Sequence, residues 1–293
     1  MKKIRTFAVA LMACALVFAF SSCEKDGVFK PKERISKIFV KDNNGNPQPS
    51  QIWVWEKGLL SSINTVGGGD IHFNYDGKVL SSITAGDDVI SFTYDGKKLE
   101  KMTYKEDGET EAEYEFTHDG KRIVTIKATM DNAFALSADA SLLQSAFNFI
   151  APQLAESQVS QLAVAAKSQG KGIYTYTDQL TYDGMNVVSV KRHDSDDHNY
   201  TWDYTYTSYA NPFYHLLAGG SDIVGFGLSK NATSGYHYAD DYITSRVIDM
   251  EITYPSVDGK YPLQETRTEK TTHTVGGLTN IYTDTDDIMY EYE

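Results

Sequence analysis

Apolar and polar residues alternate with a period of two along most of the chain. Phe73 and Tyr75 flank Asn74, and the same pattern recurs at Trp202–Tyr206 and around Ile252. Alternation of this kind predicts strands with one buried face. Thr, Tyr, Val, Ile and Phe dominate these runs, as packing in a sheet favours. We therefore predict a mainly β protein.

Turn signals separate the predicted strands. Asn-Gly occurs at Asn44-Gly45, and Asp-Gly pairs begin at Asp76, Asp95, Asp107, Asp119, Asp183 and Asp258. Such pairs supply the positive φ angles of tight hairpin turns. The sequence thus predicts an antiparallel meander of hairpins.

Several of these turns belong to an internal repeat. Its form is aromatic, Asp, Gly, Lys or Met, any residue, aliphatic, two residues, then Ile, Met or Val. Copies begin at Tyr75, Tyr94, His118 and Tyr182, and a degenerate copy begins at Trp55. A single hairpin is marginally stable, whereas stacked hairpins share a core.

The spacing inside the repeat constrains the sheet. Leu80 and Ile83 are three residues apart, so in a regular strand they would point to opposite faces. Either a bulge lies between them or both faces are covered. Because bulges and twist curl a meander, we predict a strongly curved sheet or open barrel.

The segment 131–170 interrupts the β pattern. It is rich in Ala, Leu, Gln and Ser, and its apolar spacing predicts a helical insertion over 133–168, broken by Pro152. We expect two short helices that cap the sheet; a helix lying on a membrane is the alternative. A further short helix is expected after Asn211-Pro212. Residues 35–293 would otherwise form a single β domain.

The N-terminus resembles a bacterial lipoprotein signal. Lys2, Lys3 and Arg5 precede the apolar run Thr6–Phe20, and Ser21-Ser22 precede Cys23. We predict a signal peptide over 1–22, lipidation of Cys23 and a tether over 23–34. The alternative is an ordinary secretory signal with an incidental cysteine.

Cysteine usage favours the lipid anchor. The chain has two cysteines, and Cys14 would leave with the signal peptide, so no intrachain disulfide can form. The predicted location is the cell envelope, lipid-anchored to the outer membrane. The anchor makes the membrane the expected partner.

The charge excludes some partners. The formal net charge is −13, and removal of Lys2, Lys3 and Arg5 changes it to −16. An acidic chain without a basic cluster in its sequence is a poor partner for nucleic acid or anionic lipid headgroups.

Several motifs together resemble a known family. They are the lipoprotein start, the repeats, Asn211-Pro212-Phe213, Leu228–Asn231, Tyr254–Leu263 and Ile288–Tyr292. The chain resembles a domain-of-unknown-function family with a porin-like fold, found in lipoproteins of gut anaerobes. Its repeats are similar to the tyrosine-aspartate (YD) repeats of surface and toxin-delivery shells. The resemblance implies a barrel-like shape and no catalytic residues. We do not expect a membrane pore, since charged residues are frequent on the short predicted strands.

No catalytic constellation or cofactor motif is recognisable. We interpret the densest cluster of potential metal ligands as a polar hairpin tip. It contains His193, Asp194, Asp196, Asp197 and His198. We therefore predict no catalytic residues, no metal and no cofactor.

Two aromatic rows are the remaining signal. Trp53 with Trp55, and Trp202 with Tyr204 and Tyr206, would each lie on one face of a strand. Such rows are either part of the core or platforms for a glycan or protein ligand. We predict a non-catalytic binding or scaffold module, and name these five residues as candidate ligand contacts. Two further hypotheses of function stay open. One is an envelope hydrolase with an unrecognised carboxylate or metal site, and the other is a structural envelope component that pairs with another protein through a strand edge.

Overall fold

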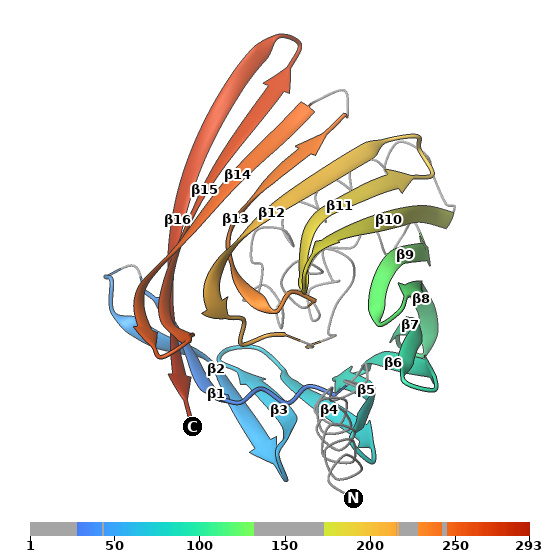
Figure 1. The fold of residues 1–293 in the computed structure, drawn as a ribbon, viewed down its shortest axis with the longest axis vertical. Helices are drawn as coiled ribbons and strands as arrows, with labels where there is room; N and C mark the ends of the chain where they lie inside the picture. Colours follow the sequence, from blue (N-terminus) through green and yellow to red (C-terminus); the bar gives the residue numbers. More distant parts are fainter. Residues whose placement is uncertain (1–27, 43, 132–172, 215, 217–227, 242–244) are drawn as a thin grey trace, which may run out of the picture.

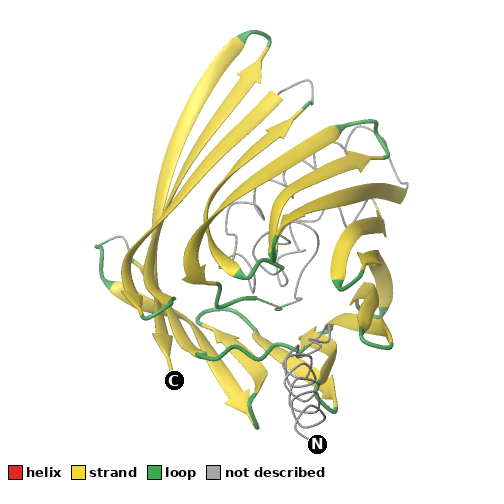
Figure 2. Ribbon diagram, viewed as in Figure 1, coloured by secondary structure: helices red, strands yellow, loops and turns green. Residues whose placement is uncertain are grey.

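The described part of the chain forms an antiparallel β-barrel (Figures 1 and 2). The computed structural model describes residues 28–42, 44–131, 173–214, 216, 228–241 and 245–293. The strands are β1 (Ile35–Lys41), β2 (Pro47–Glu56), β3 (Leu59–Thr65), β4 (Asp70–Asp76), β5 (Val79–Ala85), β6 (Asp88–Asp95), β7 (Lys98–Glu106), β8 (Glu109–Asp119), β9 (Arg122–Asp131), β10 (Ile173–Asp183), β11 (Asn186–Asp194), β12 (Asn199–Ala210), β13 (Asn231–Asp240), β14 (Ser245–Asp258), β15 (Tyr261–Val275) and β16 (Leu278–Tyr292).

Each strand pairs with its neighbours in sequence, and β1 pairs with β16. The predicted meander is confirmed, but the sheet closes, so the expectation of an open barrel was wrong. Closure removes most of the exposed edge that an open sheet would carry. The predicted signal peptide, Cys23 and the helical insertion 133–168 lie outside the described residues. Within the described ranges, no helix is long and apolar enough to cross a membrane.

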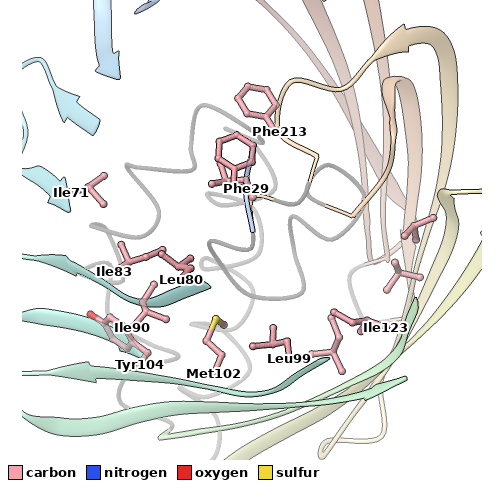
Figure 3. Packing of buried hydrophobic residues seen from close by; sticks show 14 of the residues in the cluster. Phe29, Ile71, Leu80, Ile83, Ile90, Leu99, Met102, Tyr104, Ile123 and Phe213 are labelled. Carbon is pink, nitrogen blue, oxygen red and sulfur yellow. The ribbon is translucent and has the colours of Figure 1, made fainter. Parts of the chain in front are cut away.

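The repeat builds the inner face through a bulge. Tyr75 pairs with Leu80, but Asn74 pairs with Ser82, so Ser81 is an extra residue on β5. Leu80 and Ile83 consequently both point inward, with exposed fractions of 4% and 2% (Figure 3). The same register shift occurs in the copies that begin at Trp55, Tyr94, His118 and Tyr182. The predicted bulge is thus confirmed, and it explains the three-residue spacing.

The repeat aromatic residue joins one copy to the previous one. The Tyr75 hydroxyl donates to the Leu60 carbonyl at 2.9 Å, and the Tyr94 hydroxyl donates to the Leu80 carbonyl at 2.8 Å. Tyr182 does the same with Ile123 at 2.8 Å. Burial raises the pKa of Tyr75 to about 12, so this hydroxyl stays a donor. The aromatic position therefore stabilises the sheet.

The outer face of the barrel is mainly polar, although exposed Ile52, Ile173 and Ile281 also lie on it. Cross-strand ion pairs lie on it, including Lys101–Glu113 and Lys37–Glu291, each at 2.6 Å. The inner face carries the apolar core (Figure 3). A membrane-spanning barrel has the opposite arrangement, with an apolar outer band. The outer face of these strands is therefore suited to water.

The predicted tether reaches the core. Phe29 is buried, and its ring centroid lies 6.5 Å from that of Trp53 and 5.7 Å from that of Trp55. At the other predicted break, the Asn211 side chain accepts the Phe213 N–H at 2.9 Å and starts a turn. No helix follows within the described residues there, so the short helix predicted after Pro212 is not formed in that part.

Candidate functional site

Among the described residues, buried charge is confined to one side of the barrel. In β1–β9, the apolar wall, the buried side chains are apolar apart from Gln51 and Ser62. In β10–β16, the charged wall, the buried charged residues are Asp178, Arg192, Asp194, Arg246, Glu265, Arg267 and Glu269. Burying a charge is costly unless partners compensate for lost hydration, so the charged wall is where a site is sought.

The two predicted aromatic rows both lie on the inner face. Trp53 and Trp55 pack with Phe29 and Phe213, and the Trp55 indole donates to the Ile35 carbonyl at 2.8 Å. The prediction that each row occupies one face is confirmed. Whether either row contacts a ligand stays a prediction.

The second row continues across the charged wall. The ring of Trp202 lies 5.1 Å from that of Tyr238, and the ring of Tyr204 lies 6.1 Å from that of Tyr236. Tyr206 lies further along β12, and its hydroxyl donates a hydrogen bond to the Val187 carbonyl. Trp202 and Tyr204 therefore belong to a larger aromatic surface, whereas Tyr206 is used in joining strands.

Register places a carboxylate in the same cross-strand row as this surface. Tyr204 pairs with Tyr236, Tyr236 with Met250, and Met250 with Glu269. Tyr236 and Glu269 have exposed fractions of 5% and 8%. The Tyr236 hydroxyl and Glu269 Oε2 are buried without a hydrogen-bond partner. Because orphaned buried polar atoms are rare and costly, they indicate a place where a ligand group or water binds.

The other oxygen of Glu269 is occupied. The Thr271 hydroxyl donates to Glu269 Oε1 at 2.5 Å. Burial raises the pKa of Glu269, while the Thr271 bond and the Arg246 charge oppose that shift. Burial also raises the pKa of the Tyr236 hydroxyl, which stays protonated. The site therefore offers one free carboxyl oxygen and one free phenol.

A neighbouring ion pair is already satisfied. Arg267 Nε donates to Glu265 Oε1 at 2.7 Å, and both side chains are buried. The nearby Glu265 charge, opposing desolvation, leaves the pKa of Arg267 raised. Arg267 thus stays charged and paired with Glu265.

The inner face becomes exposed a few residues beyond Glu269. On β15 and β16, exposed fractions reach 49% at Val275, 63% at Tyr282 and 75% at Leu278. Tyr282 pairs with Thr271, and Leu278 pairs with Val275. Glu269 therefore lies on β15 between the buried part of the inner face and the exposed tip of the β15–β16 hairpin.

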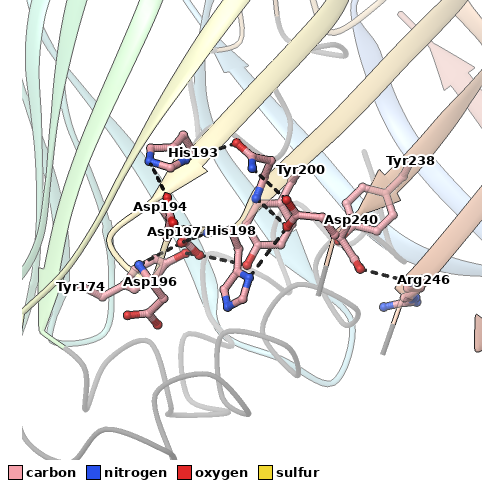
Figure 4. Close-up of polar contacts among 12 residues, drawn as sticks. Tyr174, His193, Asp194, Asp196, Asp197, His198, Tyr200, Tyr238, Asp240 and Arg246 are labelled. Atoms are coloured by element: carbon pink, nitrogen blue, oxygen red, sulfur yellow. Dashed lines mark hydrogen bonds and ion pairs between the residues drawn. The ribbon is translucent and has the colours of Figure 1, made fainter. Parts of the chain in front are cut away.

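The cluster at 193–198 is a structured hairpin tip (Figure 4). The Asp194 carboxylate accepts the hydroxyls of Tyr174 and Tyr200 and the backbone N–H groups of Asp196 and His198, each at 2.9 Å. Beside it, Arg192 is paired with Asp178 at 2.8 Å. Across the described ranges, no three His, Cys, Asp or Glu side chains are grouped so as to hold a metal ion. Asp194 therefore acts as the centre of a turn.

Sequence reasoning missed Tyr236 and Glu269. A signal was present in β15, where Glu265, Arg267, Glu269 and Thr271 share the parity of one strand face. Because these residues are polar, the alternation alone predicts that this face is exposed to solvent. The inward direction depends on the pairing of Glu269 with Met250, which only the fold shows.

No family model matches the chain, and no curated protein matches it. Among solved structures, the chain is similar to a porin-like protein from Bacteroides uniformis ATCC 8492. The TM-score is 0.47 at 12% sequence identity, covering 92% of this chain and 100% of that chain. The resemblance to a domain-of-unknown-function family stays a prediction.

Proposed function

We propose that this protein is a lipid-anchored binding module of the cell envelope that takes a glycan on the inner face of its charged wall. The observation that carries the proposal is a pair of buried atoms without hydrogen-bond partners: the hydroxyl of Tyr236, whose ring packs against that of Tyr204, and Glu269 Oε2, two strands further along the same row. The module is non-catalytic and requires no metal or cofactor.

The chemistry of this surface suits a sugar. A sugar ring presents an apolar C–H face to an aromatic ring and hydroxyl groups at its edge. Trp202, Tyr204, Tyr236 and Tyr238 supply aromatic faces with polar tips, and Glu269 supplies an acceptor. Binding sites commonly combine apolar walls with a few convergent polar groups.

The envelope location is supported by the sequence. Cys23 follows an apolar leader and is the single cysteine left after its removal. The acidic chain, −13 overall, is suited to an extracytoplasmic surface and not to nucleic acid. Metabolic acyl labelling tests the anchor: wild type should carry label and Cys23→Ala should not. Label on both proteins, or on neither, contradicts this part of the proposal.

A glycan array with the purified mature protein tests the ligand class. We expect binding to a restricted set of glycans, and at least about tenfold weaker binding by Glu269→Gln, since one well-placed hydrogen bond to a charged group contributes about 1.5–3 kcal/mol. Asp249→Asn, on the outer face of β14, is the matched control and should bind as wild type does. A blank array contradicts the proposal.

A specific feature favours hydrolysis as the second candidate. Glu269 pairs with Asp284 across β15 and β16, so two carboxyl-bearing side chains lie next to each other on one face of the sheet, one buried and one exposed. Burial and the nearby Asp284 charge raise the pKa of Glu269, which is the pattern of an acid and a base in glycosidases. Release of reducing sugar that is lost in both Glu269→Gln and Asp284→Asn would establish this candidate; no release from array-positive glycans excludes it.

A protein ligand would use a different surface. Residues 278–287 of β16 pair with β15, but β1 pairs only with 288–292, so one side of that stretch has no strand partner among the described strands. An extended segment of another protein could add there by backbone hydrogen bonding. In-cell crosslinking from Thr283→Cys would recover such a partner, and recovery of monomer alone would argue against it.

A further inference from the structure

The five repeat turns and the turn between β14 and β15 gather at one end of the barrel. In a meander, every second hairpin opens to the same end, so the turns 57–58, 77–78, 96–97, 120–121, 184–185 and 259–260 lie together. The start of β1 and the end of β16 lie there too, since the Glu293 N–H donates to the Arg34 carbonyl at 2.9 Å. We name this end the repeat-turn end, and the opposite end the tall end.

The connections at the two ends differ in charge. Five of these six turns have an exposed lysine at one of their two central positions, and neither central position is acidic. These lysines are Lys57, Lys78, Lys97, Lys121 and Lys260. At the tall end, the described connection residues include no lysine or arginine. Their acidic residues are Asp42, Asp87, Asp107, Asp196, Asp197 and Asp241.

Acidic residues do occur near the lysines. The strand before each of the six turns ends in an acidic residue; these are Glu56, Asp76, Asp95, Asp119, Asp183 and Asp258. Lysine has the longer side chain and occupies the turn itself, so its ammonium group reaches beyond the carboxylate. Within the described residues, none of the five turn lysines forms an ion pair. Their charges therefore remain available to an external surface.

Chain length fixes which end lies near the anchor. Phe29 is buried against Trp55, two residues before the turn at Lys57. Only the five residues 24–28 separate it from Cys23, and an extended chain of that length spans about 20 Å. β16 has 15 residues and is about 50 Å long, so its far end cannot be equally close.

We propose that the repeat-turn end is a membrane-facing surface whose lysines contact anionic lipid headgroups, with the tall end directed away. This inference rests on the lipid anchor of the proposed function. Each lysine close to an anionic surface contributes favourably, and the acidic tall end is repelled from it. The glycan site would then open away from the membrane that carries the protein.

Fluorescence quenching tests this orientation. The lipidated protein is inserted in vesicles of phosphatidylcholine and phosphatidylglycerol that contain a headgroup-spin-labelled lipid. A fluorophore is placed at Lys97→Cys or, as the matched position at the other end, at Asp107→Cys; acylated Cys23 does not react. We expect quenching at position 97 to be at least about threefold stronger, since spin-label quenching acts over short range. Equal quenching, or stronger quenching at position 107, overturns the orientation.

Two controls separate the parts of the proposal. Flotation with the vesicles tests the anchor: protein that floats without differential quenching refutes the orientation alone, and protein that does not float refutes both. With the fluorophore at Lys97→Cys, the added change Lys57, Lys78 and Lys121→Gln should at least halve the quenching. The same change at outer-face Lys101, Lys127 and Lys191 should leave quenching unchanged. Equal effects of the two triple changes overturn the role of the turn lysines.

Discussion

The apolar wall and the charged wall share the same antiparallel pairing but bury different kinds of side chain. In the apolar wall, each repeat copy directs two aliphatic side chains inward, as Leu80 and Ile83 show (Figure 3). In the charged wall, inward positions hold ion pairs and tyrosines, such as Asp178–Arg192 and Tyr236. The repeat is therefore a structural unit of the sheet. Candidate chemistry lies where the inward positions depart from apolar residues.

The largest effect is expected from breaking the buried ion pair of the charged wall. Asp178→Ala leaves the Arg192 guanidinium, stacked 3.7 Å from the Tyr176 ring, buried without its carboxylate. Loss of one partner of a buried pair costs about 3–5 kcal/mol. Urea unfolding measures this, with exposed Asp203→Ala as control. A loss similar to that of the control would mean that the pair is not buried as described.

A slightly smaller effect is expected from truncating the apolar wall. Leu80→Ala removes a fully inward side chain at the repeat bulge. We expect a loss of about 2–5 kcal/mol in the free energy of unfolding, from lost burial and the remaining cavity. Thr93→Ala, on the outer face of β6, should cost little. Near-equal stabilities would show that the bulge does not direct Leu80 inward.

The repeat turn comes next. Gly96 has a φ of +61°, a conformation that alanine adopts at a cost of about 1–2 kcal/mol. Gly69 has no positive φ and open space around its Cα, so Gly69→Ala is the matched control. Thermal unfolding should place Gly96→Ala below wild type and Gly69→Ala near it. The reverse order would contradict the turn geometry.

The hydroxyl that joins repeat copies contributes less. Tyr94→Phe removes its bond to the Leu80 carbonyl and should cost about 0.5–1.5 kcal/mol. Exposed Tyr282→Phe, at the tip of β16, should cost nothing measurable. A loss above that of Leu80→Ala would indicate that the hydroxyl has another role.

The smallest effect concerns pH. The pKa of Glu269 is raised in the folded state, so its protonated form favours folding below the ordinary value of 4.5. That contribution is lost as pH rises through the raised pKa, because the carboxylate is then buried in charged form. Glu269→Gln should therefore gain stability relative to wild type as pH rises. A difference in stability that does not change with pH would contradict the raised pKa.

The sequence predicted the β-sheet scaffold more completely than the candidate binding site. The turn glycines and the spacing of Leu80 and Ile83 led to the meander and the bulge, because both depend on local chemistry. Closure depends on β1 pairing with β16, more than 240 residues apart, and no local signal carries it. Glu269 and the turn lysines were missed for the same reason: register brings Glu269 into one row with Tyr236, two strands away, and the meander brings Lys57 and Lys97 to one end.

The most direct test of the division between the two walls is a titration of the strongest array-positive glycan against three proteins. Wild type and Tyr94→Phe, a change in the apolar wall, should bind with the same Kd. Tyr236→Phe, the same chemical change in the charged wall, should bind at least about fivefold more weakly, since a neutral hydrogen bond contributes about 1 kcal/mol. Equal affinity of Tyr236→Phe and wild type would contradict the placement of the site.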